Sequence, residues 1–259
     1  MIKKIFTAFL FVLLVACSNQ NSEDLENIEQ AFDNNQNLES GTFESVSLEE
    51  SDGESLESKI RGSFINDEGG DSTWYVFNHY NTSNEEDYME RAKIDGKIYN
   101  QFVLDDEEAQ WQEVANPGVA ATLYEMEPLI NYEELDHVDT VETEEIAGLT
   151  HYIVTFTKER SDRIVEDTVE DMEEAVEREK EKGITDEVIE LMEMNIEEMK
   201  GTVFSDMINT YVVDQEGQLV EVHYESVVTR PDGVPISFRS STILTDYNLE
   251  NTDGLIPTI

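Results

Sequence analysis

Cysteine is almost absent from this chain of 259 residues, which contains only Cys17, so no disulfide can form within it. Basic residues are scarce too, with 16 Lys and Arg against 60 Asp and Glu, and the net charge is −44. Such a chain is repelled by nucleic-acid phosphates and by anionic lipid headgroups. The composition therefore excludes a disulfide-stapled fold and excludes nucleic acid as a partner.

Catalytic and metal-binding motifs are also absent. The sequence has no HExxH, CxxC, GxSxG or SxxK motif and no glycine-rich phosphate loop. The four histidines lie in four separate segments, and we interpret them as residues of strand faces: His79, His137, His151 and His223. We expect no catalytic residues, no metal and no cofactor. A hydrolase that uses two of the many carboxylates stays open as an alternative.

Two further patterns could hold a metal ion, and each has a simpler interpretation. The acidic runs 67–71 and 105–108 could bind Ca²⁺ weakly, but they lack the ligand order of an EF-hand and are typical of acidic hairpin tips. A methionine group, comprising Met192, Met194, Met199 and Met207, could offer thioethers to Cu(I). Met192 and Met199 are seven residues apart on one helical stripe, which favours packing or a soft lining for an apolar ligand.

The first residues have the pattern of an export signal. Lys3 and Lys4 precede an apolar run over residues 5–14, which is too short to span a bilayer as a helix. The following Leu14-Val15-Ala16-Cys17 resembles the lipobox of bacterial lipoproteins, in which the cysteine sulfur receives a diacylglyceryl group before cleavage. The resemblance implies a signal peptide over residues 1–16, lipidation of Cys17 and a lipidated tether over 17–24. We expect a lipid-anchored protein on the outer, extracytoplasmic face of the cell membrane.

The remainder, residues 25–259, has the aromatic content of a packed domain, with 11 Phe, 10 Tyr and 2 Trp in the chain. Leu25, Ile28 and Phe32 follow the spacing i, i+3, i+7 and predict a short amphipathic helix. From Thr42 onward, segments of six to ten residues alternate between apolar and polar side chains, with turn residues between them. Asp95-Gly96 is the clearest of these turns, because this dipeptide favours type I′ hairpins.

Later segments extend the same pattern. We predict strands over 138–144, 149–157, 203–213, 219–229 and 236–247. Pro117 predicts a helix start, and Pro128 predicts its interruption. A charged insertion over Ser161–Lys200 contains two apolar stripes at helical spacing, separated by Gly183, and predicts a helical hairpin.

The predicted fold class is therefore α+β: a curved antiparallel sheet of about ten strands, a half-barrel, with helices over its concave face and the hairpin 161–200 as an insertion. The order of elements resembles the LolA/LppX-like lipoproteins of Gram-positive bacteria. That resemblance rests on the helix near residue 25, the strand Thr42–Leu48, the hairpin Ile94–Tyr99, the segment Trp111–Val114, the helix from Pro117 and the final strands Tyr211–Tyr247. It implies a half-barrel that accommodates acyl chains or other hydrophobic ligands.

We therefore expect a non-catalytic, membrane-anchored lipoprotein that binds a lipid or another apolar or amphiphilic ligand. Alternation suggests six aromatic residues for the core or for the lining of a cavity: Trp74, Tyr99, Trp111, Phe156, Tyr211 and Tyr224. The alternative is an interaction module of the cell envelope that docks onto a protein partner through the acidic helical hairpin.

Overall fold

The computed structural model describes residues 21–66, 72–82, 86–102, 110–114, 126–130 and 135–258. The predicted signal peptide, Cys17, the two acidic runs and the helix expected from Pro117 lie outside these residues.

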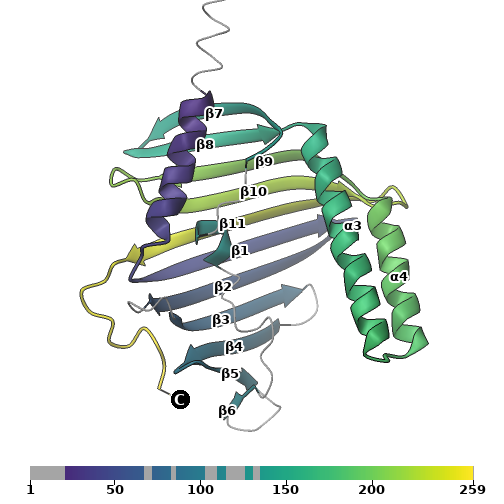
Figure 1. Cartoon of the computed structure of the whole chain (residues 1–259). Coiled ribbons are helices and arrows are strands. Elements are labelled where there is room, and N and C mark those ends of the chain that lie inside the picture. Colours follow the sequence, from purple (N-terminus) through teal and green to yellow (C-terminus); the bar gives the residue numbers. More distant parts are fainter. Residues whose placement is uncertain are drawn as a thin grey trace, which may run out of the picture.

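Eleven strands form one open antiparallel sheet in the order β6-β5-β4-β3-β2-β1-β11-β10-β9-β8-β7 (Figure 1). The strands are β1 (Ser40–Ser51), β2 (Glu54–Asn66), β3 (Ser72–Thr82), β4 (Glu86–Ile94), β5 (Lys97–Phe102), β6 (Gln110–Glu113), β7 (Val138–Ile146), β8 (Leu149–Phe156), β9 (Val203–Val213), β10 (Leu219–Thr229) and β11 (Pro235–Tyr247). The predicted curved half-barrel of the α+β class is confirmed, with eleven strands in place of about ten. The centre of the sheet is the pairing of β1 with β11, which joins the two ends of the described chain.

Tight turns link most neighbouring strands, and the sequence identifies why they form. Asp95 and Gly96 both have positive φ angles, 51° and 74°, as a type I′ turn between β4 and β5 requires. Ala147 and Gly148 adopt the same conformation between β7 and β8. The predicted Asp95-Gly96 hairpin is thus confirmed.

An N-terminal helix over residues 21–35 crosses one face of the sheet, in front of the strands from β7 to β11 (Figure 1). Its stripe Ile28, Ala31 and Phe32 is buried, and the Phe32 ring meets Tyr211 edge-on with centroids 5.7 Å apart. The helix starts earlier than predicted, so it includes residues 21–24, which were expected to be tether. Asp24 accepts a hydrogen bond from the Thr143 hydroxyl of β7 at 3.0 Å, which fixes this first turn on the sheet.

Asn35 locks the end of this helix to two other segments. Its side-chain amide donates hydrogen bonds to the carbonyl oxygens of Leu129 and Leu219, at 2.9 and 2.8 Å, and its Oδ1 accepts one from the Leu219 N–H at 3.0 Å. Leu129 belongs to the short helix α2 (Glu127–Ile130), which contains Pro128 in its first turn. Proline is tolerated there because the first N–H groups of a helix have no intrahelical acceptor. Pro128 therefore lies in the first turn of a short helix, and the helix from Pro117 that it is predicted to interrupt lies outside the described residues.

The predicted helical hairpin is present as α3 (Lys158–Glu181) and α4 (Asp186–Lys200), between β8 and β9. It has a small core of its own, made of Val176, Ile189 and Ile196. Two ion pairs bridge the helices, Lys180–Glu193 at 3.2 Å and Lys200–Glu173 at 3.1 Å. None of the helices in the described ranges is both long enough and apolar enough to cross a membrane.

Candidate functional site

The strand ends nearest the hairpin expose an apolar wall. Val228 of β10 lies directly opposite Phe204 of β9 and opposite Ile236 of β11, so these three side chains share one face of the sheet. Phe238 lies two residues further along β11 on the same face, opposite Ser226. This is the face that carries the N-terminal helix, because Val222 and Tyr211 share it at the other end.

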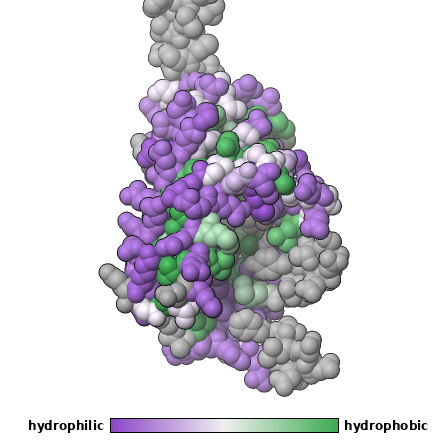
Figure 2. Space-filling view, turned by 90° about the vertical axis from the view of Figure 1, so that its right-hand side faces the viewer, coloured by the Kyte–Doolittle hydropathy of each residue, from purple (hydrophilic) through white to green (hydrophobic). Residues whose placement is uncertain are grey.

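Together with the base of the hairpin, this wall encloses a groove of about 520 Å³. We call it the hairpin groove. Its lining residues are Glu49, Met172, Asn195, Glu198, Met199, Thr202, Phe204, Ser226, Val228, Arg230, Ile236 and Phe238. Figure 2, which looks at the molecule from the hairpin side, shows apolar residues in a recess that hydrophilic residues surround.

The chemistry of the groove suits an apolar guest. Methionine side chains from both helices face the aromatic and branched side chains of the sheet, and thioether chains adapt to irregular shapes. Charge is confined to three of the lining residues, and two of them pair with each other, because Arg230 Nε lies 3.7 Å from Glu198 Oε1. The volume falls within the roughly 300–1,000 Å³ of small-molecule pockets. The groove can therefore desolvate a hydrocarbon segment while a polar end stays in water.

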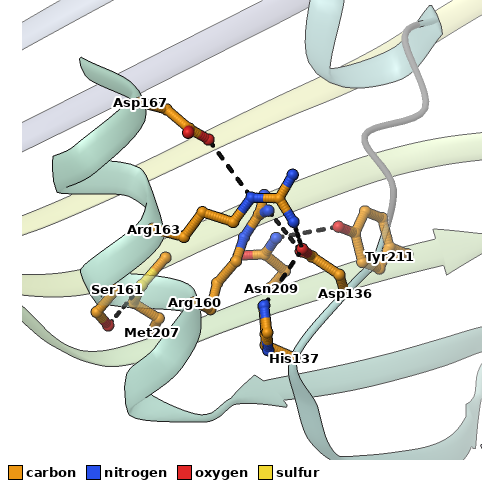
Figure 3. A network of polar contacts seen from close by, with 9 residues as sticks. All are labelled: Asp136, His137, Arg160, Ser161, Arg163, Asp167, Met207, Asn209 and Tyr211. Atoms are coloured by element: carbon orange, nitrogen blue, oxygen red, sulfur yellow. Dashed lines mark hydrogen bonds and ion pairs between the residues drawn. The ribbon is translucent and has the colours of Figure 1, made fainter. Parts of the chain in front are cut away.

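A polar network fixes the first turns of α3 on the sheet and thereby positions the hairpin (Figure 3). Asp136 accepts hydrogen bonds from Arg160 Nη1, at 2.6 Å, and from Arg163 Nη1. The Asp136 and Arg160 side chains are only 19% and 17% exposed, so their ion pair is better shielded from solvent than those along the outer faces of the hairpin. Arg160 also lies over the Phe156 ring, 5.9 Å from its centroid. These contacts anchor the hairpin at its base, next to β7 and β8.

A second set of contacts also lies at the base of the hairpin, where α4 ends and α3 begins. Gly201 ends α4, and a Cβ atom at this position would lie 2.7 Å from Cγ of Pro231 in the β10–β11 turn. Only glycine permits this approach without displacement of the proline. On α3, the buried Ser161 hydroxyl donates a hydrogen bond to the Met207 sulfur of β9 at 3.3 Å. Both helices are thus fixed where they meet the sheet, and the groove lies between these two fixed ends.

Four of the six predicted core or cavity residues belong to the main core, and two lie on the other face of the sheet. Trp74 and Tyr211 are buried in the main core, and Phe156 and Tyr224 pack against it. Tyr99 lies opposite Ala92, which lies opposite Tyr75, and Trp111 contacts Tyr75 with ring centroids 6.4 Å apart. Tyr99 and Trp111 therefore lie on the sheet face opposite the helices. The role of these six as cavity lining stays a prediction, and the hairpin groove has a different set of residues.

The other expectations for single residues can be placed as well. His79, His151 and His223 lie on strands, and His223 Nε2 is 3.0 Å from Glu221. His137 is the exception to the strand-face interpretation, because it precedes β7 with a φ of 56° and lies 3.5 Å from Asp136. Within the described ranges no three His, Asp or Glu side chains are placed to hold a metal ion together.

The sequence held a partial signal for the groove. Met199 stood out as a possible soft lining for an apolar ligand, and the structure places it there with Met172. Phe204, Val228 and Phe238 alternate correctly within their strands, but alternation does not show that the ends of three strands extend beyond the core. Only the tertiary structure places the ends of those strands beside the base of the hairpin.

Comparisons with known proteins find similarity only in structure. No protein-family model and no curated protein matches the chain. The solved structure of LprF from Mycobacterium bovis shares 11% identity at a TM-score of 0.43, over 92% of this chain and 97% of that one. A putative outer membrane lipoprotein-sorting protein domain from Vibrio parahaemolyticus shares 8% identity at a TM-score of 0.29, over 87% and 93% of the two chains. Because these scores are below 0.5, the function is inferred from the groove itself, and membership of the LolA/LppX-like family stays a prediction.

Proposed function

We propose that this protein is a non-catalytic binder of a hydrophobic or amphiphilic molecule, and that the hairpin groove holds the apolar part of the ligand. The observation that carries the proposal is an apolar recess of about 520 Å³ between the sheet and the helical hairpin, each of which has a hydrophobic core outside the recess. The sheet has its main core under the N-terminal helix, and the hairpin has its own core. Neither element needs the groove to be filled in order to fold, so a guest can enter without displacing core side chains.

The predicted lipid on Cys17 would hold this groove at the outer face of the cell membrane. Two or more acyl chains on one cysteine exceed the marginal membrane affinity of a single chain. The acidic domain is repelled by anionic headgroups, so it would stand away from the bilayer on its anchor. We expect Cys17→Ala to release the protein from the membrane fraction of the producing cell, whereas full retention would contradict lipid anchoring.

Ligand binding is tested by filling the groove. Ser226 lines it, and Ser226→Phe adds a ring to the recess, whereas Ser241→Phe adds the same ring to the opposite sheet face beside Val46 and His223. The probe is N-phenyl-1-naphthylamine, an uncharged apolar dye whose fluorescence rises out of water. We expect Ser226→Phe to weaken dye binding about tenfold, which is about 1.4 kcal/mol, and Ser241→Phe to leave it unchanged.

Native mass spectrometry of protein that lacks residues 1–17 gives a second measurement. Every described element begins after residue 17, so this protein keeps the fold. Copurified lipid that disappears in Ser226→Phe supports the proposal. Absence of any lipid, together with no dye uptake by the unsubstituted protein, contradicts it.

A further inference from the structure

Helix α4 carries two apolar faces, and among the described residues one of them packs against α3 while the other is exposed. Ile189, Met192 and Ile196, three and four residues apart, pack against α3. A second set of apolar side chains is exposed: Val188, Leu191 and Met194 on the same helix, and Ile184 directly before its N-cap. We call these four residues the α4 stripe. Leu191 and Met194 are 53% and 59% exposed, so the hairpin core gains nothing from them.

The α4 stripe continues the side of the helix that borders the hairpin groove. Counting from Val188, Leu191 follows at i+3, and the groove residues Asn195 and Glu198 follow at i+7 and i+10. Positions with this spacing lie on one side of an α-helix. The groove side of α4 therefore extends as an open apolar surface from the groove toward the hairpin tip.

The openness of the α4 stripe determines what can cover it. A hydrocarbon chain laid on a convex, half-exposed helix face would leave most of its own surface in water. A second helix can cover such a face completely, because its apolar side chains interdigitate with the stripe at an axial distance of about 8–10 Å. The helical part of the stripe, from Val188 to Met194, covers six residue steps, or roughly 9 Å of helix, which is nearly two turns of a partner helix.

The charges around the stripe select the partner. Glu187 and Glu190 border it, and neither forms an ion pair with any residue in the described ranges. The hairpin, residues 158–200, contains 17 Asp and Glu against 7 Lys and Arg. This field repels anionic membranes and a second copy of the chain, and it attracts a cationic surface.

We infer that the α4 stripe docks a cationic amphipathic helix of a partner protein, with apolar side chains on Val188, Leu191 and Met194 and Lys or Arg side chains facing Glu187 and Glu190. This goes beyond the proposed ligand binding, because the docking surface lies outside the groove residues. The two helices would pack face to face, with apolar anchors of the partner at i, i+3, i+4 and i+7 providing affinity and flanking charges providing orientation.

The inference is tested with defined peptides rather than with a cell extract. The probe is an 18-residue fluorescein-labelled peptide of Leu and Lys, with Leu at i, i+3, i+4 and i+7 spacing. One control peptide has the same composition with Leu distributed around the helix, and another has Glu in place of Lys. Protein lacking residues 1–17 is titrated into each, and binding is followed by fluorescence anisotropy at several salt concentrations.

Two variants and one matched control variant locate the contact. Leu191→Gln with Met194→Gln should weaken binding of the amphipathic Leu/Lys peptide about tenfold, and Glu187→Gln with Glu190→Gln should weaken it about threefold and flatten its salt dependence. Ile146→Gln, at a site 49% exposed in the β7–β8 hairpin, should have no effect. None of these positions lines the groove, so dye uptake should be unchanged in all of them.

Three results would overturn the inference. Equal binding of the scrambled or the acidic peptide would remove the partner chemistry. An unchanged affinity in Leu191→Gln/Met194→Gln would remove the surface. Loss of dye uptake in that double variant would assign the stripe to the ligand site instead, whereas failure of the groove variants alone would leave docking intact.

Discussion

Both ends of one sheet face are covered by helices, yet one end is filled and the other holds a groove. Under the N-terminal helix, Phe32, Tyr211 and Leu219 are almost completely buried. Under the hairpin, Phe238 is 36% exposed and lines open space. The same alternating strands supply both regions, so the difference comes from the helices.

The N-terminal helix and the helical hairpin differ in where they bury their apolar side chains. The N-terminal helix buries its stripe, Ile28, Ala31 and Phe32, in the main core together with side chains of the sheet. The hairpin buries Val176, Ile189 and Ile196 between its own helices and contacts the sheet at its base. A cover that is stable by itself can leave space beneath it, and this separation is what makes the groove possible.

The largest expected difference in stability is between alanine substitutions of one phenylalanine at the filled end and one at the groove. Phe32→Ala should lower the free energy of unfolding by about 3–5 kcal/mol, because it leaves a cavity in a close-packed core. Phe238→Ala should lower it by less than about 1 kcal/mol, because that ring already borders open space. Urea unfolding of both variants measures the contrast, and similar losses would mean that the two ends are packed alike.

The next effect concerns the polar lock at the filled end. Asn35→Ala removes three buried hydrogen bonds and leaves the Leu219 N–H without an acceptor, so we expect a loss of about 2–4 kcal/mol. Asn37→Ala is the matched control, because its side chain makes one exposed bond to the Asp33 carbonyl. Equal midpoints of thermal unfolding in the two variants would show that Asn35 does not couple the helix to β10.

A smaller effect is expected where the hairpin is anchored. Asp136→Asn removes the charge shared by Arg160 and Arg163 and should cost about 1–2 kcal/mol. Hydrogen exchange should accelerate in the first turns of α3 and not in the N-terminal helix. Asp162→Asn, which removes an exposed pair with Lys158, should change little. Faster exchange across the whole sheet would refute a local anchor.

The smallest effect is a tyrosine titration at the filled end. The Tyr247 hydroxyl donates a hydrogen bond to Asp214 at 2.6 Å, and this bond, with partial burial and the Asp214 charge, raises the pKa of Tyr247 above its usual value near 10. Its contribution to stability is fully present below that value and is lost as the pH rises toward the folded-state pKa. Ultraviolet titration should show that the Tyr247 hydroxyl ionises above the usual pH range of tyrosine, and that Asp214→Asn lowers the pH at which it ionises. An unchanged titration would remove this coupling.

The sequence predicted the elements better than their faces. The boundaries of β9 and β10 were predicted to the residue, and β11 begins one residue early, because tight turns punctuate regular alternation there. The start of α3 was missed by three residues, since Lys158–Arg160 contributes nothing to the apolar stripe. The rest of the hairpin was predicted because its two apolar stripes have helical spacing.

Irregular pairing explains where alternation failed. A register shift between Leu219 and Glu221 buries Leu219 completely and leaves Val220 partly exposed, although strict alternation would place Val220 on the same buried face as Val222. Such bulges reverse the parity of a strand and leave no clear local signature. Tyr99 and Trp111 show a related limit, because alternation tells which residues share a face but not which face the helices cover.

The sequence by itself therefore determined the strands, the helical hairpin and the antiparallel order of neighbours, because these depend on turns and on periodicities of two and 3.6 residues. Only the tertiary structure decided that β1 pairs with β11, that the helices share one face, and that the hairpin base leaves a groove over Phe204, Ile236 and Phe238. Those outcomes depend on contacts between residues far apart in the chain, whose burial is settled jointly by every element that meets there.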